Sequence, residues 1–276
     1  MHDVYFFTDV HGQLRLYNYL KDFCFSSDPE TTIIYGGDAC DRGEHGYEIM
    51  KDLLDNPRII YLQGNHEQLF CKAARAILGK YPEAVNKTIE IDQIPEYDVL
   101  LHLYNGGEPT LKAWINDGAP REIIDELSSL PYICSYENMD FSHACIPFPS
   151  FQELQNAHLD AFSIQDCLWS RDFFMGWPSK RINIHGHTPT PLLPEKIYGP
   201  NKDDSFSHPC YWKGVQADPD YRGWRLDMDT GMTFVGRAYV LNCTTNTITG
   251  FSDPQVLKPK TPAPITQIEQ YKLKLE

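Results

Sequence analysis

The chain has 276 residues, of which 42% are hydrophobic and 13% aromatic, which is enough apolar material for one substantial core or two small ones. Its formal net charge of −14 argues against a nucleic-acid-binding or anionic-membrane surface, because both need basic patches. It does not exclude an anionic substrate, since bound divalent ions can reverse the local field. The eight cysteines form no Cys-x-x-Cys pair, and no apolar run approaches the ~20 residues that span a bilayer. We therefore expect a soluble, cytoplasmic protein with reduced thiols and no membrane or nucleic-acid partner.

The first part of the chain alternates between β-branched apolar runs and amphipathic runs. Strands are predicted over residues 3–8, 31–35 and 58–62, and helices over residues 13–25, 46–54 and 67–78. This alternation is typical of βαβ units with right-handed crossovers, so we expect a largely parallel sheet. Open α/β sheets place their ligands at the carboxyl ends of such strands.

The rest of the chain has a different pattern. Residues 80–130 have weaker periodicity and predict a helical insert that caps one side of the site, with a break near Asp117-Gly118. Further strands are predicted over residues 132–136, 139–142, 181–184, 224–229, 233–241 and 247–251. We expect residues 195–222 to form a loop and the proline-bearing residues 252–276 to form a surface tail. No linker composition divides the chain, which predicts a single domain over residues 1–276.

Four short segments that follow apolar runs carry groups suited to metal binding. They are Asp9-Val10-His11-Gly12, residues 37–43 (Gly-Asp-Ala-Cys-Asp-Arg-Gly), Gly64-Asn65-His66-Glu67 and Gly186-His187-Thr188. One Asp-x-His is most often a buried strand with a turn, but four such segments in order are not chance. The candidate ligands are Asp9, His11, Asp38, Asn65, His143 and His187. Carboxylate oxygens with imidazole nitrogens suit Mn, Fe, Zn or Ni.

These ligands divide into two sets that share one carboxylate. Asp9, His11 and Asp38 can hold one ion, and Asp38 can bridge to a second ion held with the remaining three candidates. Two ions about 3.5 Å apart can clamp a phosphoryl group and share a deprotonated water. We expect that water to attack phosphorus in line, without a covalent intermediate.

Four other side chains complete the predicted site. His66 follows the ligand Asn65, and we assign it as the general acid for the leaving alkoxide, with Asp41 fixing its tautomer and raising its pKa. Arg42 and Arg171 offer forked donors for phosphate oxygens.

Other polar residues near these segments have simpler explanations. Strand alternation sends His185 away from its neighbour His187, so we expect it to be packed in the interior. His102 lacks a motif, and we expect a surface or core histidine. Asp227 and Asp229 fit a strand and a tight turn better than a metal pair.

With these segments in view, the chain resembles the calcineurin-like metallophosphoesterases, in the branch of the phosphoprotein phosphatases. The match includes the three segments at 9–12, 37–43 and 64–67 and the two later histidines in Ser142-His143-Ala144 and Gly186-His187-Thr188. Asn105-Gly106-Gly107 with Thr110, and Trp-Ser-Arg at 169–171, are similar to bacterial and phage serine/threonine phosphatases and to symmetrical diadenosine tetraphosphatases. The similarity covers about residues 3 to 251.

The resemblance implies an α/β fold, a four-layer α/β/β/α sandwich of two mixed sheets, with a dinuclear metal site at the sheet edges. It also supports the ligand set and the role of His66. Two positions depart from the family pattern. Gln63 stands where an arginine is usual, which removes one phosphate-binding cation, and Pro189 stands where the wider superfamily often has a second histidine.

The sequence thus predicts a two-metal phosphatase, with manganese as the first choice, that acts on phosphomonoesters, above all phosphoserine or phosphothreonine in proteins. The alternative is a dinucleotide polyphosphate hydrolase that cleaves diadenosine tetraphosphate with the same core. A non-catalytic binding protein with a decayed site ranks lowest, because no ligand is missing. The sequence leaves the oligomeric state open.

Overall fold

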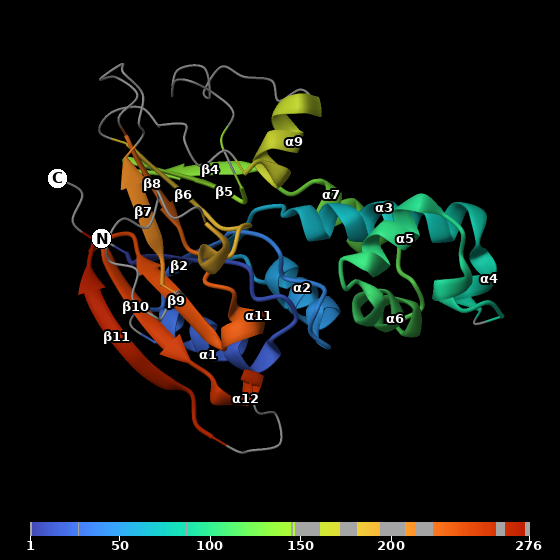
Figure 1. Cartoon of the computed structure of the whole chain (residues 1–276), viewed down its shortest axis with the longest axis horizontal. Coiled ribbons are helices and arrows are strands. Elements are labelled where there is room, and N and C mark those ends of the chain that lie inside the picture. Colours follow the sequence, from blue (N-terminus) through green and yellow to red (C-terminus); the bar gives the residue numbers. More distant parts are fainter. Residues whose placement is uncertain are drawn as a thin grey trace.

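The structure is a computed structural model, and it describes residues 2–26, 28–86, 88–144, 146, 161–171, 181–193, 208–213, 223–257 and 263–273. Two mixed β-sheets lie face to face, and helices cover the outer face of the first sheet (Figure 1). This arrangement confirms the predicted α/β class with two mixed sheets.

The first sheet has six strands in the order β11-β10-β9-β1-β2-β3. Its parallel part consists of β1 (Val4–Phe7), β2 (Thr32–Tyr35) and β3 (Ile59–Tyr61), joined by α1 (Leu14–Phe25) and α2 (Gly46–Asp55). Its antiparallel part consists of β9 (Arg237–Asn242), β10 (Thr247–Ser252) and β11 (Thr266–Lys272). The parallel part puts the carboxyl ends of β1, β2 and β3 on one edge of the sheet.

The second sheet has five strands in the order β4-β5-β6-β8-β7. They are β4 (Ile133–Tyr136), β5 (Met139–Ser142), β6 (Ile182–His185), β8 (Trp224–Asp227) and β7 (Cys210–Lys213), and β5, β6 and β8 are mutually parallel. Strand β7 lies within the residues 195–222 that we expected to form a loop. Of the rest of that segment, residues 195–207 and 214–222 lie outside the described part of the chain.

Alternate residues of the first sheet face two separate apolar cores, as a strand period of two requires. Phe6 and Ile34 face the second sheet, where the ring centroid of Phe6 lies 5.2 Å from that of Phe141. Tyr5 and Phe7 face the other way, toward the core that α1 and α2 cover. The central strands β1 and β2 are therefore buried on both faces, which fits their nearly continuous apolar sequences.

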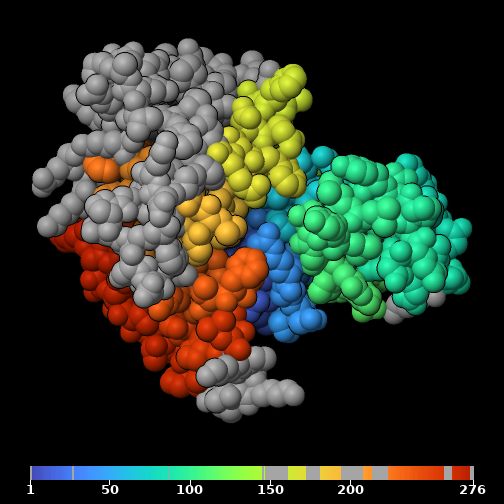
Figure 2. Space-filling model, viewed as in Figure 1, coloured from blue at the N-terminus to red at the C-terminus, as the bar shows by residue number. Residues whose placement is uncertain are grey.

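The part of the chain between β3 of the first sheet and β4 of the second is helical, as the sequence predicts. It begins with α3 (Asn65–Lys80), and the insert that follows contains α4 (Pro82–Val85), the 3₁₀ turn η1 (Ile91–Gln93), α5 (Tyr97–Tyr104), α6 (Glu108–Asn116) and α7 (Glu122–Ser128). These helices lie together at one side of the two sheets (Figure 1), and in the space-filling view they form a teal-to-green lobe that projects from the molecule (Figure 2). The predicted break is present, and Gly118 there has a φ of +87°, a conformation that favours glycine.

Two segments near the C-terminal end differ from expectation. The prediction of a strand from residue 233 was wrong at its start, because α11 (Met232–Val235) forms one helical turn between two glycines of left-handed conformation, Gly231 and Gly236. The expected tail forms α12 (Pro254–Leu257) and then β11, which adds an edge to the sheet beside β10. Free backbone groups at a sheet edge accept a further strand whatever its side chains, so composition alone did not predict this pairing.

Two short elements complete the described chain, α9 (Ala161–Trp169) after β5 and η2 (Thr190–Leu192) after β6. Among the residues that the structure describes, no helix has both the length and the apolar character needed to cross a bilayer.

Candidate metal centre

Three loops from the first sheet meet at one edge because β1, β2 and β3 are parallel. The backbone N–H of Asp9 donates to the Gly37 carbonyl at 3.1 Å, and the N–H of His11 donates to the Asp38 carbonyl at 3.1 Å. Asn65 opens α3 directly after the third of these strands. The segments at residues 9–12, 37–43 and 64–67 therefore lie together at this edge of the sheet.

The second sheet brings two histidines to the same place. His143 follows β5 and His187 follows β6, and Nδ1 of His143 donates to the Gly36 carbonyl of the first sheet at 2.9 Å. The backbone N–H of His187 lies 3.2 Å from both carboxylate oxygens of Asp9. The edges of the two sheets thus meet at the site, as the resemblance implied.

Backbone strain is concentrated at this edge. Nine non-glycine residues in the described chain have positive φ, and six belong to the predicted site, namely Asp9, His11, Asp38, Asp41, Arg42 and His187. Left-handed backbone costs free energy for residues other than glycine and persists where the surroundings impose it. The close packing is visible at Gly64, where an added Cβ would lie 2.3 Å from Oδ1 of Asp38.

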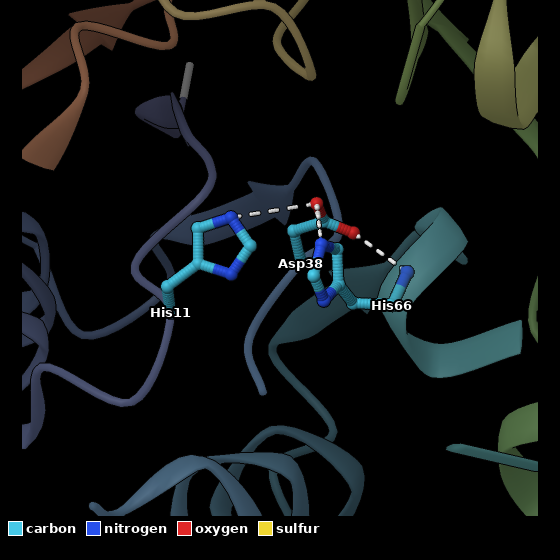
Figure 3. A group of neighbouring side chains, drawn as sticks. All are labelled: His11, Asp38 and His66. Atoms are coloured by element: carbon cyan, nitrogen blue, oxygen red, sulfur yellow. Dashed lines mark hydrogen bonds and ion pairs between the residues drawn. The ribbon is translucent and has the colours of Figure 1, made fainter. Parts of the chain in front are cut away.

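Two groups of potential metal donors share Asp38. The first is His11, Asp38 and His66, and the second is Asp38, His143 and His187, with all ligand atoms of a group within 4.8 Å of one another. Figure 3 shows the first group, in which Oδ2 of Asp38 lies 3.5 Å from Nε2 of His11 and 3.8 Å from Nε2 of His66. Oδ1 of Asp38 faces the other group, 3.3 Å from Nε2 of His143. One carboxylate therefore offers an oxygen to each side.

The second group has the electronic character of a cation site. Because Nδ1 of His143 donates to a carbonyl, Nε2 of neutral His143 has a lone pair, and it faces the Asn65 Oδ1 acceptor at 2.9 Å. Nδ1 of His187 faces the same Asn65 oxygen at 3.0 Å, whereas its Nε2 is buried and has no hydrogen-bond partner among the described residues. Burial lowers the pKa of His187 well below its usual value, and the neighbouring imidazole of His143 lowers it further. A divalent ion would satisfy these facing lone pairs, so the donors fit one.

The first predicted set is only partly assembled. Nδ1 of His11 lies 2.9 Å from the Cys40 carbonyl, which leaves its Nε2 toward Asp38. Asp9 belongs to neither donor group of the described chain, and its Oδ2 accepts a hydrogen bond from Thr8 at 2.6 Å. Burial, then repulsion by Asp229 and Asp38, raises the pKa of Asp9 well above its usual value. A cation beside these carboxylates would remove that repulsion.

His66 and Asp41 form the buried pair that the sequence predicts. Nδ1 of His66 donates to Oδ2 of Asp41 at 2.7 Å. Burial alone lowers the pKa of His66, but the charge of Asp38 and the hydrogen bond and charge of Asp41 outweigh it and raise that pKa above its usual value. For Asp41, burial raises the pKa, yet His102 and His66 more than offset this and hold the pKa well below its usual range. The pair therefore favours an imidazolium beside a carboxylate.

The two predicted arginines lie at the exposed side of the site. Nη1 of Arg42 is 2.8 Å from Nε2 of His11 and Nη2 is 3.1 Å from Nε2 of His66. Nε of Arg171 donates to the Thr188 hydroxyl at 3.3 Å. Burial raises the pKa of Asp229 to about 7, and the charges of both arginines act to lower it.

Three other residues have roles that the sequence reasoning missed. The carboxylate of Glu67 accepts backbone N–H groups of Asp38 at 2.9 Å, Ala39 at 2.7 Å and Gly64 at 2.8 Å, which holds the loop after β2 against α3. Its position three residues after the N-cap Gly64 is that of the acidic residue of a capping box. Asp229 makes the expected turn, accepting the Gly231 N–H at 2.9 Å, and its charge also helps to raise the pKa of Asp9.

His102 is the third. Instead of being an isolated core histidine, it places Nε2 2.9 Å from both carboxylate oxygens of Asp41. The one available signal was its position on the helix just before Asn105-Gly106-Gly107.

Two expectations concerned positions beside the ligands. His185 is buried against the Trp212 ring, with centroids 5.8 Å apart, so it is packed as predicted. Gln63 is also buried, and its Nε2 donates to the Leu127 carbonyl of α7 at 2.5 Å. The residue in the place of the usual arginine therefore holds the insert and does not face the donor groups.

A family model described as calcineurin-like phosphoesterase matches residues 2–191. The chain belongs to the calcineurin-like phosphoesterase family. Membership makes it one of a family of metal-dependent hydrolases, and the shared Asp38 with its imidazoles is the metal-site candidate. A search of curated proteins found no match.

Several solved structures are similar to this chain at low identity. A protein assigned as a diadenosine tetraphosphatase has 14% identity and a TM-score of 0.46, with 97% of this chain and 93% of that chain covered. A metallophosphoesterase from Sphaerobacter thermophilus has 13% identity and a TM-score of 0.46, covering 91% and 83%. A protein serine/threonine phosphatase from Saccharomyces cerevisiae has 14% identity and a TM-score of 0.44, covering 100% and 81%. These similarities do not identify a substrate.

Proposed function

We propose that this family member is a dinuclear-metal phosphatase that hydrolyses phosphomonoesters, with phosphoserine and phosphothreonine of proteins as its substrates. The observation that carries the proposal is the hydrogen-bonded pair of His66 and Asp41 beside two donor groups that share Asp38. A mere metal-binding protein would need the donors but not an acid supported by a buried carboxylate.

In this proposal, one ion is held by Asp9, His11 and Asp38. A second is held by the four donors Asp38, Asn65, His143 and His187. Two such ions supply Lewis acidity that activates water and neutralises phosphoryl oxygens. The mixture of carboxylate, amide and imidazole donors favours manganese, with iron, zinc or nickel as alternatives.

The protein groups have separate roles in this reaction. Arg42 and Arg171 bind phosphoryl oxygens through their guanidinium forks. His66 donates the proton on Nε2 to the leaving alkoxide, and Asp41 stabilises the imidazolium through Nδ1. Nη2 of Arg42 lies 3.1 Å from the same Nε2, and because a guanidinium and a protonated Nε2 both donate, an anionic phosphate beside them would accept from both.

The surroundings of the site support a protein substrate. Arg42 and Arg171 are exposed, so a phosphate on a large molecule can reach them. Tyr104 is 89% exposed at the end of α5, two residues before Gly106, whose carbonyl accepts the backbone N–H of Arg42 at 2.9 Å. An exposed aromatic residue therefore belongs to the chain segment that contacts Arg42, and an extended peptide can contact such a side chain.

The first test is to remove metal from the protein, reload it with Mn, Ni, Zn or Mg in turn, and measure hydrolysis of an aryl phosphate. We expect fast turnover with Mn or Ni. No turnover with any metal, although two ions are bound, would contradict the phosphatase proposal.

The active metal form then decides the substrate. Turnover of phosphoserine peptides is compared with that of diadenosine tetraphosphate, and we expect the larger kcat/KM for the peptide. The reverse order would replace the protein substrate with a dinucleotide polyphosphate.

A further inference from the structure

His102 lies on α5 of the helical insert and reaches the catalytic edge of the sandwich. Its side chain is completely buried. The ring lies 6.0 Å from the Phe70 ring, edge to face, and an added Cβ on Gly107 would lie 2.3 Å from the imidazole. The ring is therefore held in one orientation from two sides.

That orientation directs one nitrogen at Asp41. Nε2 of His102 lies 2.9 Å from both carboxylate oxygens, and because an ionised carboxylate only accepts, this nitrogen carries the proton. Nδ1 of His102 is buried and has no hydrogen-bond partner among the described residues. No second polar contact in the described chain competes for the ring, so its polar interaction is directed to Asp41.

Residues of the insert thus hold Asp41 in place, and Asp41 in turn contacts His66. Its carboxylate accepts from His102 on one side and from Nδ1 of His66, at 2.7 Å, on the other. Its backbone N–H donates to the hydroxyl of buried Thr110 on α6 at 3.0 Å. Its φ of +69° is a conformation that needs support from the surroundings. Helices α5 and α6 supply that support.

We propose that His102 is a positioning residue that orients the Asp41 carboxylate, so that His66 keeps its proton-donating Nε2 aimed at the leaving group. The inference rests on the proposed function, because it concerns the proposed acid. It also gives the insert a specific role, because its helices position the carboxylate that supports the proposed acid, His66. The proposed metal donors, in contrast, come from the two sheets and the first turn of α3. A core histidine with only a packing role would not act on His66.

The test uses substitutions that differ in reach. His102→Gln keeps an N–H donor near the position of Nε2, whereas His102→Asn is also polar but too short to reach Asp41. His102→Leu removes the donor altogether. Val99→Ala is the matched control, since Val99 is buried on the same helix one turn earlier.

Kinetics on two phosphomonoesters separate positioning from packing. A phosphoserine peptide has an alkoxide leaving group that needs a proton, whereas 4-nitrophenyl phosphate has a good leaving group that does not. In the Mn-loaded protein, we expect His102→Leu and His102→Asn to lower kcat on the peptide about 10–100-fold, as loss of an outer-shell partner does. The expected loss on the aryl ester is smaller, KM changes little, and His102→Gln recovers most of the peptide rate.

Equal losses on both esters, or no recovery with Gln, would overturn the inference and leave a packing role. If the Leu variant does not fold, the contrast between Gln and Asn carries the same test. An inactive wild-type protein would contradict the proposed function, and the inference is then judged by a readout that needs no activity. In the metal-free protein, we expect the Nδ1–H proton of His66 to give a protected NMR resonance that is lost in His102→Asn and kept in His102→Gln and Val99→Ala. Its persistence in His102→Asn would refute the positioning role.

Discussion

The two halves of the site are built differently. In the acid half, formed by His66, Asp41 and His102, each hydrogen bond runs from a protein donor to a protein acceptor. In the metal half, Nε2 of His143 and Nδ1 of His187 both face Oδ1 of Asn65, and the charge of Asp38 helps to raise the pKa of Asp9. Hydrogen bonds within the protein hold the first half together, whereas the second half gathers groups that a cation would bind.

The largest effect should come from the residue that belongs to both donor groups. We expect Asp38→Asn to lower kcat/KM more than about 10⁴-fold, because each of the two ions contributes several kcal/mol of transition-state stabilisation. Metal analysis of the purified variant should find both ions reduced. Asp117→Asn, a change at a surface carboxylate on the insert, serves as the control. A variant that keeps two ions and normal turnover would show that the donor groups do not meet at Asp38.

A substitution in the acid half should leave the amount of bound metal unchanged. We expect His66→Asn to lower kcat on phosphopeptides about 10³-fold, within the range of general acid catalysis, with metal content unchanged. His45→Asn, at an exposed histidine just after the second segment, is the control. An undiminished rate would refute the acid role, and loss of bound metal would place His66 in the metal half instead.

Arg42 contacts the imidazoles of His11 and His66 and should act mainly on binding. We expect Arg42→Ala to raise KM for an aryl phosphate about 10–100-fold, since a charge-assisted hydrogen bond contributes about 1.5–3 kcal/mol. Arg42→Lys should recover only part of the loss, because a lysine cannot form a bidentate contact. The control is Arg58→Ala, at an arginine stacked on Phe25 away from the site. An unchanged KM would remove Arg42 from the phosphate site.

The smallest expected effect concerns stability. Binding of Mn at 100 times its Kd should raise the free energy of unfolding by about 2.7 kcal/mol, which denaturant titration can measure. We expect His187→Ala to lose more than half of this gain, because it removes a donor of the metal half. His45→Ala should keep all of it. An equal gain in all three proteins would mean that Mn binds elsewhere.

The polar segments could be predicted because their information is local. In Asp9-Val10-His11-Gly12 and in residues 37–43, the candidate ligands follow an apolar strand. Because neighbouring parallel strands end at the same edge of a sheet, the ligands that follow them lie close together. The helical insert and the two mixed sheets followed from periodicity and from the family resemblance. The short β7 and the edge strand β11 did not, because their pairing depends on which backbone edge is free.

The sequence by itself determined the metal donors, the acid and the phosphate-binding arginines as candidates, since each lies in a short segment of recognisable chemistry. Only the tertiary structure decided which groups support them. His102 is 61 residues from Asp41 in the chain, and Gln63 sits close to a ligand in sequence yet bonds to α7. A buried polar side chain must find a partner wherever packing places one, so its function depends on long-range contacts that no local pattern records.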